Sequence, residues 1–170
     1  MFTISISNRQ TTLEVDEDRL KEVTRSILTD HDVEQAEISI AVVDDDSIHQ
    51  INLQFLNHDY STDVLSFPLE RDGNRLVGEV IVSADTAKTD SNRFGWSPAD
   101  ELLLYVIHGM LHLVGYDDVD REKRRQIRAQ EARYLAKFDL SPRWDIIDST
   151  KDSMVSYSKP PQEEQTSREP

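Results

Sequence analysis

The chain has 170 residues, of which 37% are hydrophobic, with a formal net charge of −14 at pH 7 and no cysteine. This length supports one domain with a substantial core, and the lack of cysteine excludes disulfides and thiolate metal sites. The strong negative charge argues against a general nucleic-acid-binding surface, which is usually basic. The N-terminal stretch has no basic region followed by a long apolar run, so we expect no signal peptide, no membrane contact and a cytoplasmic protein.

The first part of the chain predicts two strands on either side of a helix. Residues 2–6 alternate apolar and polar side chains, as a half-buried strand does. Residues 16–29 begin with acidic side chains and repeat apolar ones at helical spacing, which predicts a helix. Residues 36–43 are rich in β-branched side chains and predict a second strand.

Three consecutive aspartates, residues 44–46, follow the second predicted strand. Aspartate side chains accept hydrogen bonds from the first amides of a helix, so these residues predict a helix that begins here. They are not followed by spaced oxygen ligands, so capping is favoured over calcium binding. The buried side of this helix is expected to carry Ile48, Ile51 and Phe55.

A hairpin and three helices are predicted next. Residues 64–67 and 76–82 predict strands joined through Asp72-Gly73, a tight-turn pair. The second strand is apolar on both faces and should lie inside the sheet. The helices are expected over residues 84–94, 98–114 and 119–138, the second opened by Ser97 and Pro98 and the third with Ile127, Tyr134 and Phe138 facing inward.

This order of elements predicts an α/β (α+β) fold with a mixed sheet of about four strands packed with about five helices. Residues 1–148 are expected to form a single domain. Residues 149–170 are rich in Ser, Pro, Gln and Glu and predict a disordered polar tail.

The strongest chemical signal is a run of eleven residues that starts at His108. His108 and His112 are four residues apart, so on a helix they lie on one face and can aim at one point. Gly115 can take a positive φ that turns the chain back towards that point. Two imidazoles and a carboxylate form a catalytic zinc set that leaves a position for water. The competing interpretation, two structural histidines without a metal, is weaker because imidazoles on an apolar helix need partners.

Either Asp117 or Asp118 could supply the carboxylate of this set. The aspartate that does not bind the ion could hydrogen-bond to a ligand imidazole and orient it. Gly109 stands where the His-Glu-x-x-His metalloproteases have their catalytic glutamate, so a peptidase mechanism of that type lacks its proton acceptor. The run therefore predicts a metal-dependent hydrolase with its ion in a cleft beside the histidine-bearing helix.

Three stretches of the chain resemble the bacterial YbeY endoribonucleases, the ribosomal RNA maturation factors. They are HGMLHLVGYD from His108, STDVLSFP from Ser61 and GEVIVS from Gly78, and the resemblance covers most of residues 4–138. It implies a zinc-dependent endoribonuclease specific for single-stranded RNA, acting at the 3′ end of 16S rRNA and in ribosome biogenesis and quality control. It also implies the small ribosomal subunit as a partner, a sheet flanked by helices, and His108 and His112 as metal ligands at the catalytic centre.

The chain departs from this family at two positions. The usual signature ends in a third histidine, and the corresponding residue here is Asp118. A carboxylate can replace an imidazole on zinc, but its charge also makes manganese or another divalent ion plausible. The family has an arginine six residues before the threonine at position 62, where this chain has Leu56. Leucine can neither clamp a phosphate nor stabilise a phosphoryl transition state.

Two features could supply part of what Leu56 lacks. His58 could act as a hydrogen-bond donor or general acid; the alternative is an exposed loop histidine. The segment 121–133 holds six basic and two acidic side chains, a net charge of +4 that leaves the rest of the chain at −18. Its RNA-binding candidates are Arg121, Arg124, Arg125 and Arg128, and the alternative is a solvated helix face.

Three functions remain open from the residues. The first is metal-dependent RNA hydrolysis, with attack by water activated at the metal or by the ribose 2′-hydroxyl. The second is a non-catalytic, metal-containing ribosome-assembly factor, which Leu56 motivates. The third, hydrolysis of a peptide or small molecule, is disfavoured by Gly109. The sequence does not indicate whether the protein is a monomer or an oligomer.

Overall fold

The computed structural model describes residues 1–141. Within them lie four strands, β1 (Phe2–Asn8), β2 (Gln35–Val43), β3 (Val64–Asp72) and β4 (Arg75–Ser83), and five helices, α1 (Glu17–Asp30), α2 (Asp45–Leu56), α3 (Ala84–Phe94), α4 (Pro98–Leu113) and α5 (Arg121–Ala136). The predicted α/β class is confirmed. The end of the predicted domain, 142–148, and the predicted tail, 149–170, lie outside the described residues. None of the described helices combines the length and apolar character that crossing a bilayer requires.

The four strands form one mixed sheet in the order β1-β2-β4-β3. β1 pairs with β2 and β2 with β4 in parallel, whereas β3 and β4 form an antiparallel hairpin. The hairpin turns through Gly73, whose φ of 53° is readily adopted by glycine. β4 lies inside the sheet between β2 and β3, as its apolar sequence predicts. One face is buried along most of the strand, and the other is buried at Ile81 and Ser83.

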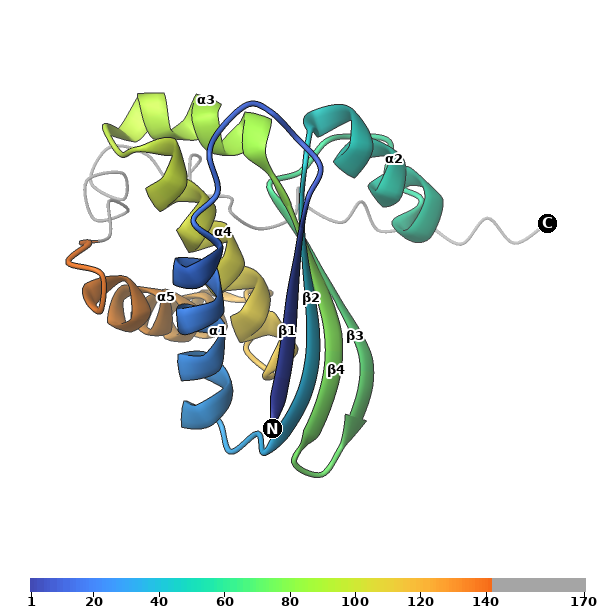
Figure 1. Cartoon of the computed structure of the whole chain (residues 1–170), viewed down its shortest axis with the longest axis vertical. Helices are drawn as coiled ribbons and strands as arrows, with labels where there is room; N and C mark the ends of the chain where they lie inside the picture. The colour runs from blue at the N-terminus through green and yellow to red at the C-terminus, as the bar shows by residue number, and fades with distance from the viewer. Residues whose placement is uncertain (142–170) are drawn as a thin grey trace.

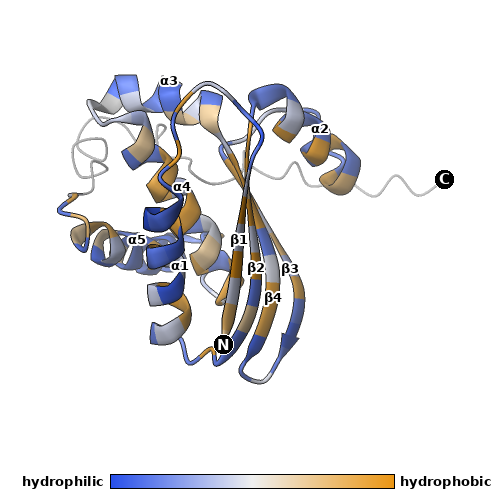
Figure 2. Cartoon of the chain, in the orientation of Figure 1, coloured by the Kyte–Doolittle hydropathy of each residue, from blue (hydrophilic) through white to orange (hydrophobic). Residues whose placement is uncertain are grey.

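Helices α1, α4 and α5 lie on one face of the sheet (Figure 1). Twelve of the sixteen residues of α4 are buried, and the helix is coloured as largely hydrophobic in Figure 2. A helix that is apolar around its circumference is expected in the middle of a core. Ser97 caps it by accepting a hydrogen bond from the amide of Asp100, as its sequence predicts.

Two glycines allow α4 to approach the sheet closely. A Cβ added at Gly109 would lie 2.6 Å from Cγ1 of Val80, and one added at Gly78 would lie 2.8 Å from Cδ1 of Leu113. At the same contact, the hydroxyl of Ser66 donates a 2.9 Å hydrogen bond to the carbonyl of Gly109. Any larger side chain at Gly109 would push the histidine-bearing helix away from β3 and β4.

Helix α2 lies on the other face of the sheet, at one end (Figure 1). Asp44 caps it by accepting from the amide of Ser47, which confirms the predicted capping role. Ile48 is fully buried and Ile51 packs against the same small cluster, but Phe55 is 65% exposed. The expectation that Phe55 faces the core is therefore wrong, because the last turn of α2 extends away from the strands.

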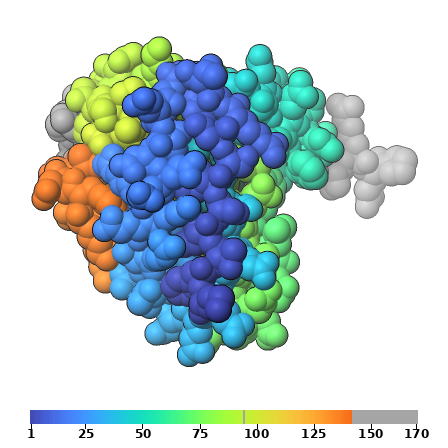
Figure 3. Space-filling model, viewed as in Figure 1, coloured from blue at the N-terminus to red at the C-terminus, as the bar shows by residue number. Residues whose placement is uncertain are grey.

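Helix α5 is fixed to α1 at the margin of the core. Ile127 and Tyr134 are buried, and Phe138, just beyond the helix, packs against the core, as predicted. The Tyr134 hydroxyl donates a 2.8 Å hydrogen bond to Asp30 at the end of α1. Figure 3 shows α1 and β1 covering much of one face of the molecule, with α5 at its edge.

Candidate metal centre and active-site cleft

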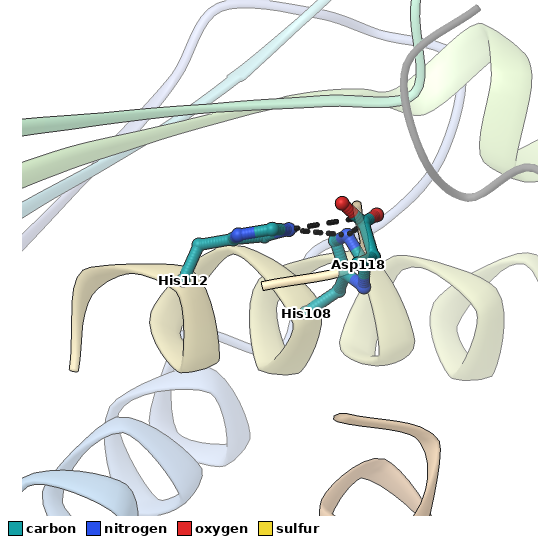
Figure 4. Close-up of side chains that lie close together, drawn as sticks. All are labelled: His108, His112 and Asp118. Carbon is teal, nitrogen blue, oxygen red and sulfur yellow. Dashed lines mark hydrogen bonds and ion pairs between the residues drawn. The ribbon is translucent and has the colours of Figure 1, made fainter. Parts of the chain in front are cut away.

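The two predicted histidine ligands project from the same side of α4 (Figure 4). The helix ends at Leu113, and Gly115 follows with a φ of 113°. This conformation favours glycine and reverses the chain, and the amide of Tyr116 then donates to the carbonyl of Leu111. The reversed chain brings Asp118 back to His108 and His112, as the spacing predicts.

Three ligand atoms converge at this point. The Nε2 atoms of His108 and His112 are 3.0 Å apart, and Oδ2 of Asp118 lies 3.7 and 3.8 Å from them. This is the only group of three or more His, Cys, Asp or Glu residues with metal-binding geometry within residues 1–141. Two imidazole nitrogens and one carboxylate oxygen suit zinc, and three protein ligands leave a coordination position for substrate or water. The residues therefore fit a divalent ion.

Glu131 of α5 holds the His108 imidazole from behind. Its Oε1 lies 2.5 Å from Nδ1 of His108, and the side chain is 2% exposed. Burial would lower the pKa of His108, but the hydrogen bond and charge of Glu131, with the charges of Asp63 and Asp118, outweigh burial and raise it. A proton held on Nδ1 leaves Nε2 as the nitrogen with a free lone pair.

From the sequence, whichever of Asp117 and Asp118 does not bind the ion could orient a ligand imidazole. In the structure the carboxylate on Nδ1 of His108 is that of Glu131. Asp117 instead accepts a 2.7 Å hydrogen bond from the amide of Asp118 and so stiffens the turn that carries this ligand. The burial of Glu131 could have been predicted from the sequence, because Glu131 lies four residues after Ile127 and three before Tyr134, on the same side of the helix as these two buried residues.

Asp63 is a second buried carboxyl near the centre that sequence reasoning did not single out. It is 7% exposed; its Oδ1 accepts a 2.8 Å hydrogen bond from the amide of Val64, and its Oδ2 has no hydrogen-bond partner among the described residues. Burial raises the pKa of Asp63 to about 7, although the charge of His108 acts in the opposite direction.

His108, His112 and Asp118 line one side of a cleft of about 400 Å³. The opposite wall comes from α2 and from the chain leading into β3, and its residues include Asn52, Leu56, His58, Tyr60 and Thr62. The predicted catalytic residue His58 therefore shares a cleft with His108. Leu56 lies on the same wall and is 37% exposed. No lysine or arginine occurs among the described residues that line the cleft.

Comparison with known proteins identifies the family. The family described as "Endoribonuclease YbeY" matches residues 5–139 of the chain. The chain belongs to the YbeY family. It is 39% identical over 137 residues to the endoribonuclease YbeY of Nautilia profundicola, covering 81% of this chain and 92% of the relative. It is 37% identical over 144 residues to that of Syntrophotalea carbinolica, covering 81% and 96%.

The fold agrees with a solved structure. The solution structure of TM1509 from Thermotoga maritima superimposes with a TM-score of 0.57 at 25% sequence identity, covering 94% of this chain and all of that one. As a member of the YbeY endoribonuclease family, the chain is a hydrolytic nuclease. The three YbeY-like stretches meet in the structure, because α4 packs on the hairpin of β3 and β4.

The four predicted RNA-binding arginines of this YbeY protein lie on α5, outside the cleft lining. Arg121, Arg124 and Arg125 are exposed, and Arg128 is partly buried. The structure therefore places His58 in the same cleft as His108, His112 and Asp118, and it leaves the four arginines outside the cleft lining.

Proposed function

We propose that this chain is a divalent-metal-dependent endoribonuclease that cuts single-stranded RNA during maturation of the 3′ end of 16S rRNA, with zinc as its ion. The observation that carries this proposal is the convergence of two imidazoles and a carboxylate inside a cleft of a YbeY-family fold. The small ribosomal subunit as partner and a cytoplasmic location belong to the same proposal, and they rest on the family resemblance.

His108, His112 and Asp118 would hold the ion, and manganese remains an alternative because of the extra carboxylate charge. A bound divalent ion supplies Lewis acidity, which polarises a phosphoryl oxygen and lowers the pKa of water. Glu131 keeps the His108 ring oriented with Nε2 towards the other two ligands. Tyr60 contacts Nδ1 of His58 at 2.9 Å, so Nε2 is the nitrogen through which His58 would donate a proton to substrate.

RNA phosphates would be bound outside the cleft. The cleft lining has no lysine or arginine among its described residues, whereas Arg121, Arg124 and Arg125 are exposed on α5. Contact between these arginines and the RNA backbone would position the strand without reading its sequence. Affinity for RNA should then fall as the salt concentration rises.

The test compares RNA cleavage by the wild type and by His112→Ala, with and without EDTA. We expect the wild type to cut a single-stranded oligoribonucleotide but not the same sequence in a duplex, and both the substitution and EDTA to abolish cutting while circular dichroism is unchanged. Products ending in a 2′,3′-cyclic phosphate would indicate attack by the ribose hydroxyl. Undiminished cutting by a metal-free or His112→Ala protein would refute the proposal.

A second candidate is a metal-containing assembly factor that binds ribosomal precursors without cutting them. Leu56 and the lack of cations in the described cleft lining favour it. Leu56→Arg separates the two functions, since the position is partly exposed and can accept a longer side chain. We expect this variant to cut RNA faster, by about tenfold for one added charged hydrogen bond. A protein that binds zinc and precursor particles but cuts no RNA in either form would establish the assembly factor.

A further inference from the structure

Three residues on the wall opposite the ligands form a connected unit. The side-chain amide of Asn52 donates a 2.9 Å hydrogen bond to the carbonyl of Tyr60, and the amide of His58 donates to the carbonyl of Asn52 at 3.2 Å. The rings of His58 and Tyr60 are stacked, with centroids 5.2 Å apart and planes 18° from parallel. Asn57, in the left-handed conformation at a φ of 55°, ends α2 and lets the chain fold back in this way.

Asn52 offers this wall an unused acceptor. Asn52 is 1% exposed, and its Oδ1 has no hydrogen-bond partner among the described residues. The orientation of the amide is fixed, because a flipped group would place Oδ1 against the carbonyl oxygen of Tyr60. A buried acceptor without a partner costs free energy, and a ligand that donates a hydrogen bond would recover it. Asn52 is one of the residues that line the cleft, so a ligand bound there would lie next to its side chain.

The chemistry of the wall favours a neutral, planar group over a phosphate. Leu56 is apolar, and the described cleft lining has no lysine or arginine but includes Asp117 and Asp118. Aromatic rings stack on the bases of single-stranded nucleic acids, and every base has a face on which to stack. Bases in a duplex are already stacked and paired, so they cannot occupy such a wall.

We propose that Asn52, His58 and Tyr60 form a nucleobase subsite, in which an unpaired base stacks beside the two rings and an N–H on its edge donates to Oδ1 of Asn52. The inference deepens the proposed function and rests on it, because it assumes an RNA substrate. The subsite explains how a cleft with Leu56 on its wall can hold RNA. The wall would bind a base of the RNA, although it has no cationic side chain that could bind a phosphate.

The test measures binding of nine-nucleotide single strands to the full chain by fluorescence anisotropy in EDTA, where cleavage does not interfere. Four homopolymers isolate the chemical groups: oligoadenylate, its abasic analogue, its purine-riboside analogue without the amino group, and its 2′-deoxy analogue. We expect oligoadenylate to bind about tenfold more tightly than the abasic strand. It should bind about fivefold more tightly than the purine strand, which lacks the base N–H donor.

Variants connect these differences to the residues. Tyr60→Ala should weaken oligoadenylate binding about tenfold, whereas Tyr60→Phe, which keeps the ring, should lose much less. Asn52→Ala should remove the preference for adenine over purine and leave the ribose-against-deoxyribose ratio unchanged. Gln54→Ala, at an exposed position of α2 outside the cleft lining, is the matched control and should bind as the wild type does.

The outcomes distinguish the inference from the function on which it rests. Equal affinity for intact and abasic strands, together with wild-type RNA cleavage in the presence of metal, would overturn the subsite alone. Loss of the ribose preference in Asn52→Ala would assign Oδ1 to the 2′-hydroxyl and overturn the base contact. A wild type that neither binds nor cuts any RNA would overturn the proposed function and the subsite together. The adenine-against-purine comparison in the wild type needs no variant and stands even if Asn52→Ala does not fold.

Discussion

The two ring nitrogens of His108 face different partners, and these partners determine which nitrogen carries the proton and which can bind a metal ion. Nδ1 meets Glu131, and Nε2 meets the other two ligands. A carboxylate behind a ligand imidazole selects its tautomer and raises its basicity. Glu131 is therefore a positioning residue whose effect should appear in metal affinity as well as in catalysis.

We expect Glu131→Gln to weaken zinc binding by about 10- to 100-fold, because the neutral amide no longer supports the positive charge that the ligand ring acquires. Competition with a chromophoric chelator measures the affinity without any RNA. Glu122→Gln, on the exposed side of the same helix, is the control and should bind zinc as the wild type does. Equal affinities in all three proteins would contradict the role given to Glu131.

Asp63 makes stability depend on pH. Its pKa is raised from 3.8 to about 7, so between these values the folded protein holds a proton that the unfolded chain has released. The free energy of unfolding therefore falls as the pH rises through this window. Above about pH 7 the folded protein must ionise a buried carboxyl.

We expect Asp63→Asn to flatten this dependence, since the amide keeps the shape and the acceptor of a protonated carboxyl but does not titrate. Relative to the wild type, the variant should gain about 2–4 kcal/mol between pH 4.5 and pH 8. Urea denaturation in EDTA measures this change. Asp72→Asn, at an exposed position of the hairpin, should keep the wild-type dependence. A wild-type slope in Asp63→Asn would show that another group titrates.

At the scale of elements, α4 and the β3–β4 hairpin act as one unit. In the sequence, Gly109 is notable because it replaces the catalytic glutamate of a metalloprotease. In the structure, glycine is needed at this position because the helix backbone lies against Val80 and the Gly109 carbonyl accepts a hydrogen bond from the hydroxyl of Ser66. The close approach fixes His108 and His112 relative to the cleft wall carried by the hairpin.

We expect Gly109→Ala to lower the free energy of unfolding by about 1–3 kcal/mol, although alanine is the better helix former, because its Cβ would overlap Val80. Chemical denaturation measures the loss. The same substitution in a Val80→Ala background should cost markedly less, since the overlapping methyl group is gone. An undiminished cost in that background would mean that overlap with Val80 is not the cause.

Helix α2 shows where local periodicity fails. The apolar spacing correctly predicts a helix and the burial of Ile48, but it places Phe55 on the same inward side. Phe55 is 65% exposed, and its ring meets that of Phe67 edge to face, with centroids 6.2 Å apart. Periodicity can identify the apolar side of a helix but not how far the surface beneath it extends.

Across the whole molecule, the proposed metal ligands come from two segments of the chain. His108 and His112 lie on α4, and Asp118 lies in the turn that leads to α5, whose Glu131 contacts His108. An ion held there would stabilise the folded protein only, because the unfolded chain does not bring these groups together.

We expect zinc at about 100 times its dissociation constant to add about 2.7 kcal/mol to the free energy of unfolding, and to raise the melting temperature by roughly 5–10 °C. Differential scanning calorimetry with and without zinc measures the shift. Asp118→Ala should lose most of it, and Asp117→Ala, beside it in the same turn, should keep it. The reverse result would show that Asp117 is the third ligand.

Helical spacing, capping and turn preferences act over a few residues, so the helix that carries His108 and His112, the reversal at Gly115 and most of the strands could be predicted from the sequence. Three features could not be predicted in this way: the order of the strands, the contact of His108 with Glu131 across 23 residues of sequence, and the cleft wall that contains Asn52 and Tyr60. Those contacts depend on which strands pair and how closely α4 packs against them. Burial, which raises the pKa of Asp63, exists only once that packing has formed.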